Sequence, residues 1–170
     1  MQSSRRVVFG LVIGGSMLAA PVSADEAGLL QELRDRAEIE ALIVRYVTAL
    51  DTLDADGYAG VFAEDADFDV AGTKYHGRSE IVKVVTGLQA SRATAEAEGR
   101  TQARLYHTMS NTLIEIVGPD EARHESYWQT VRVGPDNVIT VGAMGRYEDV
   151  LVKRDGQWLI QSRKVVPFTN

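Results

Sequence analysis

The stretch "RLYHTMSNTLIEIVGPDEARHESYWQTVRV", residues 104–133, carries two long strand patterns joined by a turn. The first pattern runs from Arg104 to Val117 and the second from Ala122 to Val133, with Gly118-Pro119-Asp120 between them. Both are rich in β-branched, aromatic and other apolar residues set between polar ones, which is typical of strands. A link this short, containing glycine and proline, favours a turn between antiparallel neighbours. These residues therefore predict a long β-hairpin.

Two further strand patterns follow this hairpin toward the C-terminus. They cover Val138 to Lys153 and Gln157 to Val166. The links before them, Gly134 to Asn137 and Asp155-Gly156, are short and contain turn residues. Four long strands joined by short turns describe an antiparallel meander.

The half of the chain before residue 104 reads mainly as helix. Leu29 to Leu50 repeats apolar residues at helical spacing, with charged residues between them. Asp54 or Asp56 can cap a short second helix that ends by Phe62, and Ser79 can cap a third. The other expected segments are short strands at Ala66–Val70 and Lys74–His76, a third helix from Glu80 to about Leu88, and a mobile loop or loose helix at Gln89–Gln102.

This order of elements predicts the fold class. Helices followed by a curled sheet give an α+β fold, a conical α+β barrel in which the N-terminal helices pack on a curved, mostly antiparallel sheet. The long first helix must cover one face of that sheet, and the cone so formed has an interior. We find no internal repeat, and residues 25–170 are expected to form one domain.

The first 24 residues predict a secretory signal peptide. Two arginines precede the apolar stretch Val7–Ala20, and Pro21–Ala24 ends on small residues that suit a signal peptidase. A membrane span is disfavoured, because about 14 apolar residues are too few to cross the bilayer. We therefore expect a periplasmic or secreted protein that starts at Asp25 and keeps no stable membrane anchor. Arg5-Arg6 permits the twin-arginine export route as well as the general secretory one.

Net charge and cysteine content limit the binding partners and the chemistry that this protein can have. The whole chain has a net charge of −6, and loss of both signal-peptide arginines leaves 16 basic and 24 acidic residues, a net charge of −8. Such a surface repels nucleic acid, so no nucleic acid partner is expected. There is no cysteine, which excludes disulfides, thiolate chemistry and cysteine-bound metals. The packed core alone must stabilise the fold.

The three histidines have different surroundings in the sequence. His76 lies in a short polar segment and His124 among charged neighbours, so we expect both to be exposed. His107 lies inside a long strand pattern, and alternation places it on one face with Met109, Asn111 and Leu113. A histidine beside Met and Leu is partly buried, and it is as readily a hydrogen-bonded core residue as a catalytic one.

Three more residues are candidates for an interior site. Asp51 ends the long helical pattern, and a buried carboxylate there requires a partner such as histidine, although capping or solvation is the commoner use of an aspartate. Tyr46 lies about 140° round the same helix, where a tyrosine is more often core than acid. Arg163 shares a strand face with Leu159, Gln161 and Val165, and the alternation alone does not say whether that face is inside.

Several motifs in order resemble a SnoaL-like domain of the nuclear transport factor 2-like superfamily, over about Arg36 to Val166. They are "RAEIEALIVRYVTALDTLDADGYAGVFAEDADFDV", "HGRSEI", "YHTMSNTLIEI" and "GRYEDVLVKRDGQWLIQSR". Enzymes of this superfamily pair an aspartate at the end of the first helix with a histidine on the first long strand, which correspond to Asp51 and His107. Accessory residues of its dehydratases and dehydrochlorinases correspond to Tyr46, Asn111 and Arg163. The combination copies no single member, since a second catalytic histidine of one dehydratase is replaced by Arg132.

The resemblance implies a cofactor-independent lyase or isomerase, of dehydratase or dehydrohalogenase type, that acts on a small, mostly apolar cyclic molecule. His107 would be the base, Asp51 would orient it, Tyr46 would donate a proton, and Arg163 would stabilise negative charge. Further substrate-binding residues would be Asn111, Tyr147, Met109, Trp128 and Phe62. No metal or cofactor is implied, and self-association as a dimer or trimer is expected by analogy.

Two other functions stay open at this point. A non-catalytic exported domain that binds a small ligand or interacts with a partner is the main alternative. An epoxide hydrolase is less favoured, because it requires a second interior aspartate for which Asp149 is the one candidate. Geometry discriminates between the enzyme and the binding domain. A bond from Asp51 to His107 at the floor of an enclosed cavity favours the enzyme, and a filled interior or a solvated Asp51 favours the binding domain.

Overall fold

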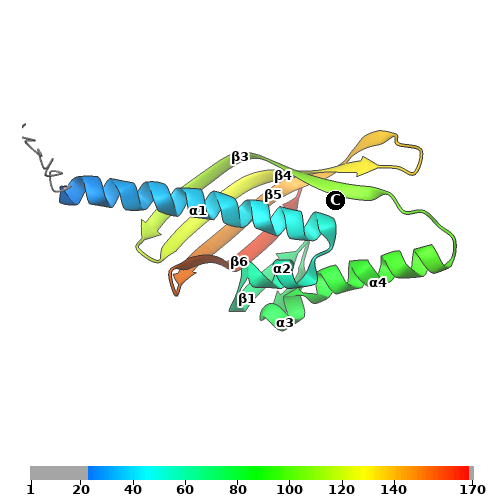
Figure 1. Ribbon diagram of the computed structural model, residues 1–170, viewed down its shortest axis with the longest axis horizontal. Coiled ribbons are helices and arrows are strands. Elements are labelled where there is room, and N and C mark those ends of the chain that lie inside the picture. Colours follow the sequence, from blue (N-terminus) through cyan, green and yellow to red (C-terminus); the bar gives the residue numbers. More distant parts are fainter. Residues whose placement is uncertain (1–22, 169–170) are drawn as a thin grey trace, which may run out of the picture.

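The computed structural model describes residues 23–168 (Figure 1). Most of the predicted signal peptide therefore lies outside the described residues. Ser23 caps the first helix, because its side chain accepts a hydrogen bond from the Glu26 backbone N–H and the Glu26 carboxylate accepts one from the Ser23 N–H. Cleavage after Ala24 would remove this capping box. Among the described helices, none is long and apolar enough to cross a membrane.

Four helices lie in residues 23–97. They are α1 (Ala24–Thr52), α2 (Ala55–Gly60), α3 (Arg78–Ile81) and α4 (Lys83–Ala97). The long first helix is confirmed, and Asp54 caps α2 by accepting a 3.0 Å hydrogen bond from the Gly57 N–H. The expected Ser79 cap is wrong, since Gly77 precedes α3 and offers no side chain. Residues 89–97 continue α4, so the loose helix describes them better than the mobile loop.

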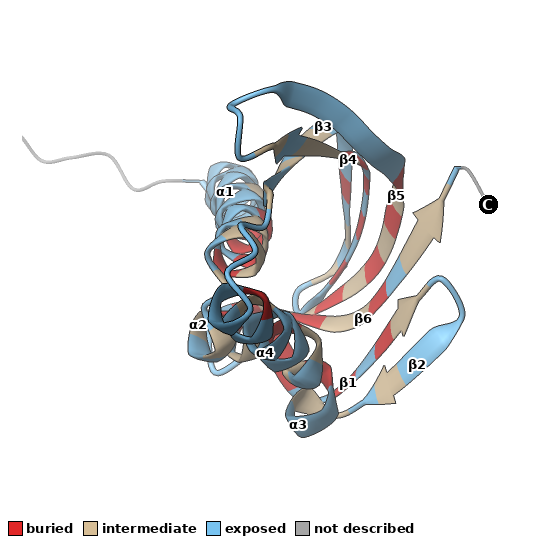
Figure 2. Cartoon of the chain, turned by 90° about the vertical axis from the view of Figure 1, so that its right-hand side faces the viewer, coloured by how far each residue is buried: buried red, intermediate tan, exposed pale blue. Residues whose placement is uncertain are grey.

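Six strands form one sheet in the order β2-β1-β6-β5-β4-β3. They are β1 (Phe62–Val70), β2 (Thr73–His76), β3 (Arg104–Gly118), β4 (Glu121–Val133), β5 (Ile139–Arg154) and β6 (Gln157–Pro167). The predicted meander is confirmed, since β3 to β6 pair with their neighbours as antiparallel strands. Only β1 and β6 pair in parallel. The sheet curls but stays open, with β2 and β3 as its edges (Figure 2). The α+β fold is confirmed.

The core lies between α1 and the concave face of the sheet (Figure 2). Ile39 and Leu42 of α1 are fully buried there, as are Leu151 and Ile160 of the sheet. Burying each such side chain stabilises the fold by about 1.5–3 kcal/mol. The first turns of α1 extend past the sheet (Figure 1) and leave their leucines exposed, so the apolar pattern overstated the buried part of this helix.

Two β-bulges change which residues face inward. The pairing of β3 with β4 shifts between Ser110 and Leu113, where Asn111 adopts a left-handed φ of 50°. Leu113 is consequently 62% exposed and Ile114 is buried. The predicted common face of His107, Met109, Asn111 and Leu113 is therefore wrong beyond Met109, because one extra residue reverses the alternation.

The bulge in the last strand determines the direction in which the Arg163 side chain points. The β5–β6 pairing shifts between Ile160 and Ser162. Trp158 and Ile160 point into the core before the shift, and Arg163 points into it afterwards. Both sets of alternate residues in β6, the one with Trp158 and Ile160 and the one with Arg163, therefore supply side chains to the core.

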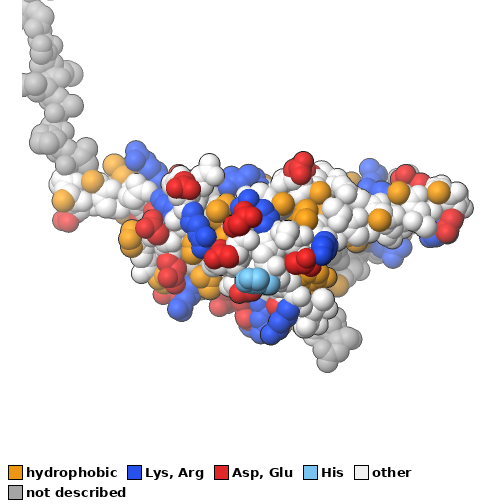
Figure 3. Space-filling model, turned by 90° about the horizontal axis from the view of Figure 1, so that it is seen from below, with side chains coloured by type: hydrophobic (Ala, Val, Ile, Leu, Met, Phe, Trp, Pro, Cys, Tyr) orange, Lys and Arg blue, Asp and Glu red, His pale blue; other side chains and the backbone are white. Residues whose placement is uncertain are grey.

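The surface carries mixed charge. Acidic, basic and apolar side chains are interspersed over the face seen from below in Figure 3. Half of the twelve described arginines lie within 4.0 Å of a carboxylate: Arg36, Arg78, Arg100, Arg146, Arg154 and Arg163. Much of the positive charge on this acidic protein is therefore neutralised locally.

Candidate active site

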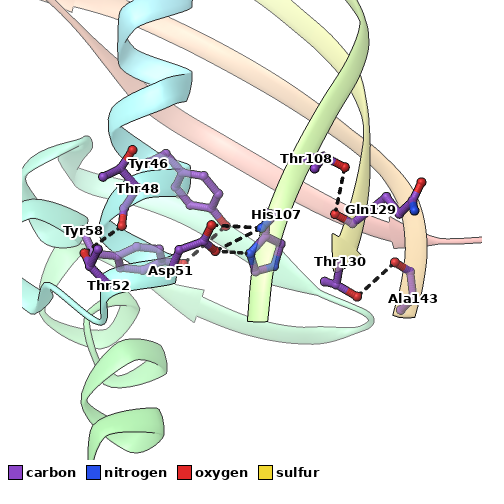
Figure 4. Close-up of polar contacts among 10 residues, drawn as sticks. All are labelled: Tyr46, Thr48, Asp51, Thr52, Tyr58, His107, Thr108, Gln129, Thr130 and Ala143. Atoms are coloured by element: carbon purple, nitrogen blue, oxygen red, sulfur yellow. Dashed lines mark hydrogen bonds and ion pairs between the residues drawn. The ribbon is translucent and has the colours of Figure 1, made fainter. Parts of the chain in front are cut away.

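Asp51 and His107 meet where the end of α1 approaches the edge strand β3 (Figure 4). The His107 Nδ1 atom lies 2.6 Å from Asp51 Oδ1, and the His107 backbone N–H donates to Asp51 Oδ2 at 2.9 Å. An edge strand has backbone N–H groups without a strand partner, and the carboxylate binds one of them. Asp51 therefore neither caps the second helix nor is simply solvated, since Asp54 caps α2 and Asp51 binds His107.

This arrangement defines the chemical state of the imidazole. When neutral His107 donates its Nδ1–H to the carboxylate, Nε2 carries the free lone pair and can accept a proton. The two side chains are 13% and 15% exposed, so both are largely shielded from solvent but still reachable. The negative carboxylate then stabilises the imidazolium that forms on proton uptake. The pair is therefore equipped to act as a general base.

A small pocket adjoins the pair. Its volume is about 110 Å³, which exceeds the space of one water molecule but falls below that of a typical ligand site. It lies between the end of α1, the helix α4 and the start of β3. The lining residues are Leu50, Asp51, Leu53, Leu88, Ser91, Arg92, Gln102, Ala103, Leu105 and His107. The reactive pair is thus placed against a mixed apolar and polar wall.

Most of the other predicted site residues lie in the packed interior and do not line this pocket. Tyr46, Phe62, Trp128 and Tyr147 are buried in the core, and Met109 packs against it. The Tyr46 ring lies 5.2 Å from that of Tyr58, and their hydroxyl oxygens are 3.5 Å apart. Asn111 is exposed at the bulge, so the alternation that assigned it to the site ends before it. The expected enclosed cavity is replaced by a filled aromatic core with a small pocket at its edge.

Arg163 belongs to a buried ionic cluster with Asp149 and His124. Its Nε and Nη2 atoms donate to the two Asp149 oxygens at 2.8 and 2.6 Å, and His124 Nδ1 lies 2.6 Å from Asp149 Oδ2. The three residues are neighbours across β4, β5 and β6, and their side chains are fully buried. The guanidinium also lies over the rings of Tyr46 and Tyr147, at 3.9 and 4.4 Å from their centroids.

The expectation that His124 is exposed is wrong. Ala122, His124, Ser126 and Trp128 all point inward from β4, and all four are buried. That period of two was visible in the sequence and outweighs the charged neighbours, which face solvent. His76 is exposed as expected, and its Nδ1 lies 2.8 Å from Asp67 Oδ1, which raises the pKa of the imidazole.

The electrostatics of the interior follow from burial and pairing. Burial alone would raise the pKa of Asp149, but the charge and hydrogen bonds of Arg163, with a further hydrogen bond from His124, hold that pKa below its ordinary value. Burial raises the pKa of the Tyr58 and Tyr147 hydroxyls, so both stay neutral. Asp149 is thus the second interior aspartate that an epoxide hydrolase requires, but both its oxygens are occupied by Arg163 and His124.

No group of three or more His, Cys, Asp or Glu side chains in residues 23–168 is arranged to hold a metal ion.

Comparison with known proteins identifies the family. The chain belongs to the SnoaL-like domains, since that family model matches residues 31–164, and it has the nuclear transport factor 2-like fold. A solved NTF2-like protein with a cystatin-like fold from Novosphingobium aromaticivorans is 23% identical, with a TM-score of 0.71 over 85% of this chain and 88% of that one. A candidate scytalone dehydratase from the same organism is also 23% identical, with a TM-score of 0.68 over 83% and 89%.

A type 2 hexachlorocyclohexane dehydrochlorinase has the same fold at 17% identity, with a TM-score of 0.67 over 82% of this chain and 88% of its own. A search of curated proteins by sequence gave no match. These likenesses confirm the fold that the sequence motifs predicted.

Proposed function

We propose that this protein is a cofactor-independent lyase or isomerase that removes a proton from carbon. The observation that carries the proposal is the 2.6 Å contact between Asp51 and His107 beside a pocket that both residues line. His107 Nε2 takes a proton from a carbon next to a carbonyl or a leaving group, and Asp51 stabilises the imidazolium. In an elimination, the electron pair of the C–H bond forms a double bond as the leaving group departs. A leaving hydroxyl takes the proton from the imidazolium and departs as water, whereas after loss of halide the imidazolium gives its proton to solvent. In an isomerisation, the imidazolium returns the proton to another carbon.

The names of the structural relatives agree with this reaction class. One is described as a candidate scytalone dehydratase and another as a hexachlorocyclohexane dehydrochlorinase, and both names denote eliminations. The buried Tyr46 and Arg163 would then act indirectly. Tyr46 packs on Arg163, and Arg163 is held by Asp149, so together they support the part of α1 that presents Asp51.

The second candidate function is a domain that binds a small ligand without converting it. The filled interior favours this alternative, because no enclosed chamber of ligand size surrounds the Asp51–His107 pair.

Isotope exchange separates the two functions without knowledge of the product. Cyclic hydroxy-ketones, sterols and halocarbons are incubated with the protein in D₂O, and NMR spectra follow exchange of carbon-bound hydrogen or release of the leaving group. The proposed function requires exchange or release that depends on His107. A His76→Ala variant is the matched control, because His76 is exposed and lies away from the pocket. Ligands that bind without any exchange would establish the binding domain instead.

We also propose that the protein is exported and self-associates. The outer face of β3 to β5 exposes apolar side chains that include Tyr106, Leu113, Tyr127 and Met144, and a second copy is a suitable cover for them.

Export predicts a specific mass for the mature protein. Cleavage of the signal peptide after Ala24 gives a chain that starts at Asp25, because Val22 and Ala24 suit the peptidase. Mass spectrometry of protein recovered from the periplasm or medium checks this start. Recovery of the chain from Met1 in the membrane fraction would contradict it.

A further inference from the structure

The pocket beside Asp51 and His107 opens onto two larger surface hollows, of about 500 and 710 Å³. The three depressions share lining residues around the link between α4 and β3. Arg92 lines both the pocket and the first hollow, and Leu105 lines both the pocket and the second. Gln102 lines all three. A molecule larger than the small pocket can therefore place the rest of its atoms in these adjoining hollows.

Four arginines line the hollows: Arg92, Arg100, Arg104 and Arg132, which we call the arginine rim. Arg100 pairs with Glu98. Within residues 23–168, no carboxylate lies within 4.0 Å of the other three guanidinium groups. Glu96 is the one acidic residue that lines either hollow. The rim thus holds excess positive charge on a chain whose net charge is −6.

The chemistry of arginine identifies what this charge can bind. A guanidinium stays protonated at any physiological pH and offers a planar set of N–H donors that matches carboxylate and phosphate groups. Arginines on an ordinary surface are solvated or paired with nearby acids, as half of those in residues 23–168 are. Arginines without a nearby acid, gathered beside the pocket that His107 lines, are suited to bind an anion from outside.

We propose that the substrate carries an anionic group, a carboxylate or a phosphate, which the arginine rim binds while the reacting carbon lies beside His107. This proposal rests on the proposed function and adds the substrate class. It narrows the apolar cyclic molecule expected from the sequence to an amphiphilic one, with an apolar end against Leu50, Leu53 and Leu105 and a charged end at the rim. The positive charge of the rim also offsets the long-range repulsion that the acidic chain exerts on an anion.

The test measures binding of matched probes by isothermal titration calorimetry at about 20 mM salt, where exposed charges are weakly screened. The probes are 3-oxocyclohexanecarboxylate, its uncharged carboxamide, and cyclohexyl phosphate. We expect the carboxylate or the phosphate to bind about tenfold more tightly than the amide, as several exposed ion pairs acting together provide. Whichever anion binds more tightly identifies the acid that the substrate carries.

Variants then locate the binding site. Combined replacement Arg92→Gln, Arg104→Gln and Arg132→Gln is expected to bring anion affinity down to that of the amide. Arg45→Gln is the matched control. The Arg45 guanidinium also has no carboxylate within 4.0 Å among the described residues, and Arg45 lines a different surface hollow, between α1 and the start of β6. Equal affinity of wild-type protein for anion and amide, or a preference that survives the triple replacement, would overturn the proposal.

The His107→Ala variant separates this proposal from the proposed function. It removes the base but keeps the rim, so its preference for anions should equal that of the wild type. If proton exchange persists in His107→Ala, the proposed reaction is wrong while the rim still stands on its binding data. If exchange is lost but the triple arginine variant keeps its anion preference, the rim is wrong and the reaction stands.

Discussion

Replacement of His107 by alanine is expected to lower turnover by about 10²–10⁴-fold, the usual contribution of a general base. The side chain supplies Nε2, and among the other lining residues Asp51 alone has a basic side chain, whose oxygens lie against His107 itself, while the rest carry apolar, amide, hydroxyl or guanidinium groups. The measurement is the initial rate on any substrate found by isotope exchange, with His76→Ala as the control that keeps full activity.

Asp51→Asn should reduce activity nearly as much as His107→Ala. Asparagine retains an oxygen for the His107 backbone N–H, but it no longer carries the charge that stabilises the imidazolium. Its amide N–H₂ can also donate to Nδ1, which places the ring proton on Nε2 and abolishes the base. An effect on the rate constant with little change in KM would exclude a merely structural role for this residue.

The double replacement should cost little more than either single one, because Asp51 and His107 act as a unit. Rates are compared for the wild type, Asp51→Asn, His107→Ala and the combined variant, with circular dichroism to verify that each is folded. Independent losses that multiply in the double variant would contradict the coupled pair. Full activity in His107→Ala would show that His107 is not the base.

The Asp51–His107 contact could be predicted from motif order but not from periodicity. Pattern alone favours capping or solvation for Asp51, and the family resemblance is what pairs it with the histidine on the first long strand. Physically the contact depends on where α1 ends relative to β3, which is a tertiary distance. Local pattern carries no information on such distances, whereas it gave the antiparallel meander and α1 directly.

The prediction of which strand residues point inward is wrong where a bulge interrupts the strand. One left-handed residue, Asn111, reverses the alternation of β3, and a register shift before Ser162 does the same in β6. The alternation of polar and apolar residues in the sequence does not indicate either bulge. In β4, which has no bulge between Ala122 and Trp128, the period of two holds and predicts the inward direction of His124. The charged neighbours of His124 face solvent and obscure this periodicity in the sequence.

The buried cluster of Asp149, Arg163 and His124 leads to the second large effect. Asp149→Asn is expected to reduce the free energy of unfolding by about 3–5 kcal/mol, because it leaves the buried Arg163 guanidinium without its counter-ion. The free energy of unfolding of a domain of this size is about 5–15 kcal/mol, so the variant should stay folded at room temperature. Urea denaturation checks the loss. The control is Asp67→Asn, whose exposed pair with His76 should contribute far less to stability.

The pH dependence of this loss follows from the lowered pKa of Asp149. A carboxylate whose pKa is lower in the folded than in the unfolded protein adds stability above the unfolded value of about 3.9, and that stability is lost as the pH falls through the folded value. The difference between wild type and Asp149→Asn should therefore stay constant from neutral pH down to about pH 5 and shrink only in stronger acid. A loss no larger than that of Asp67→Asn, or one that disappears near neutral pH, would show that Asp149 does not hold Arg163 in the core. Replacement of the pair together, Asp149→Leu with Arg163→Met, should restore much of the stability, because no buried charge then lacks a partner.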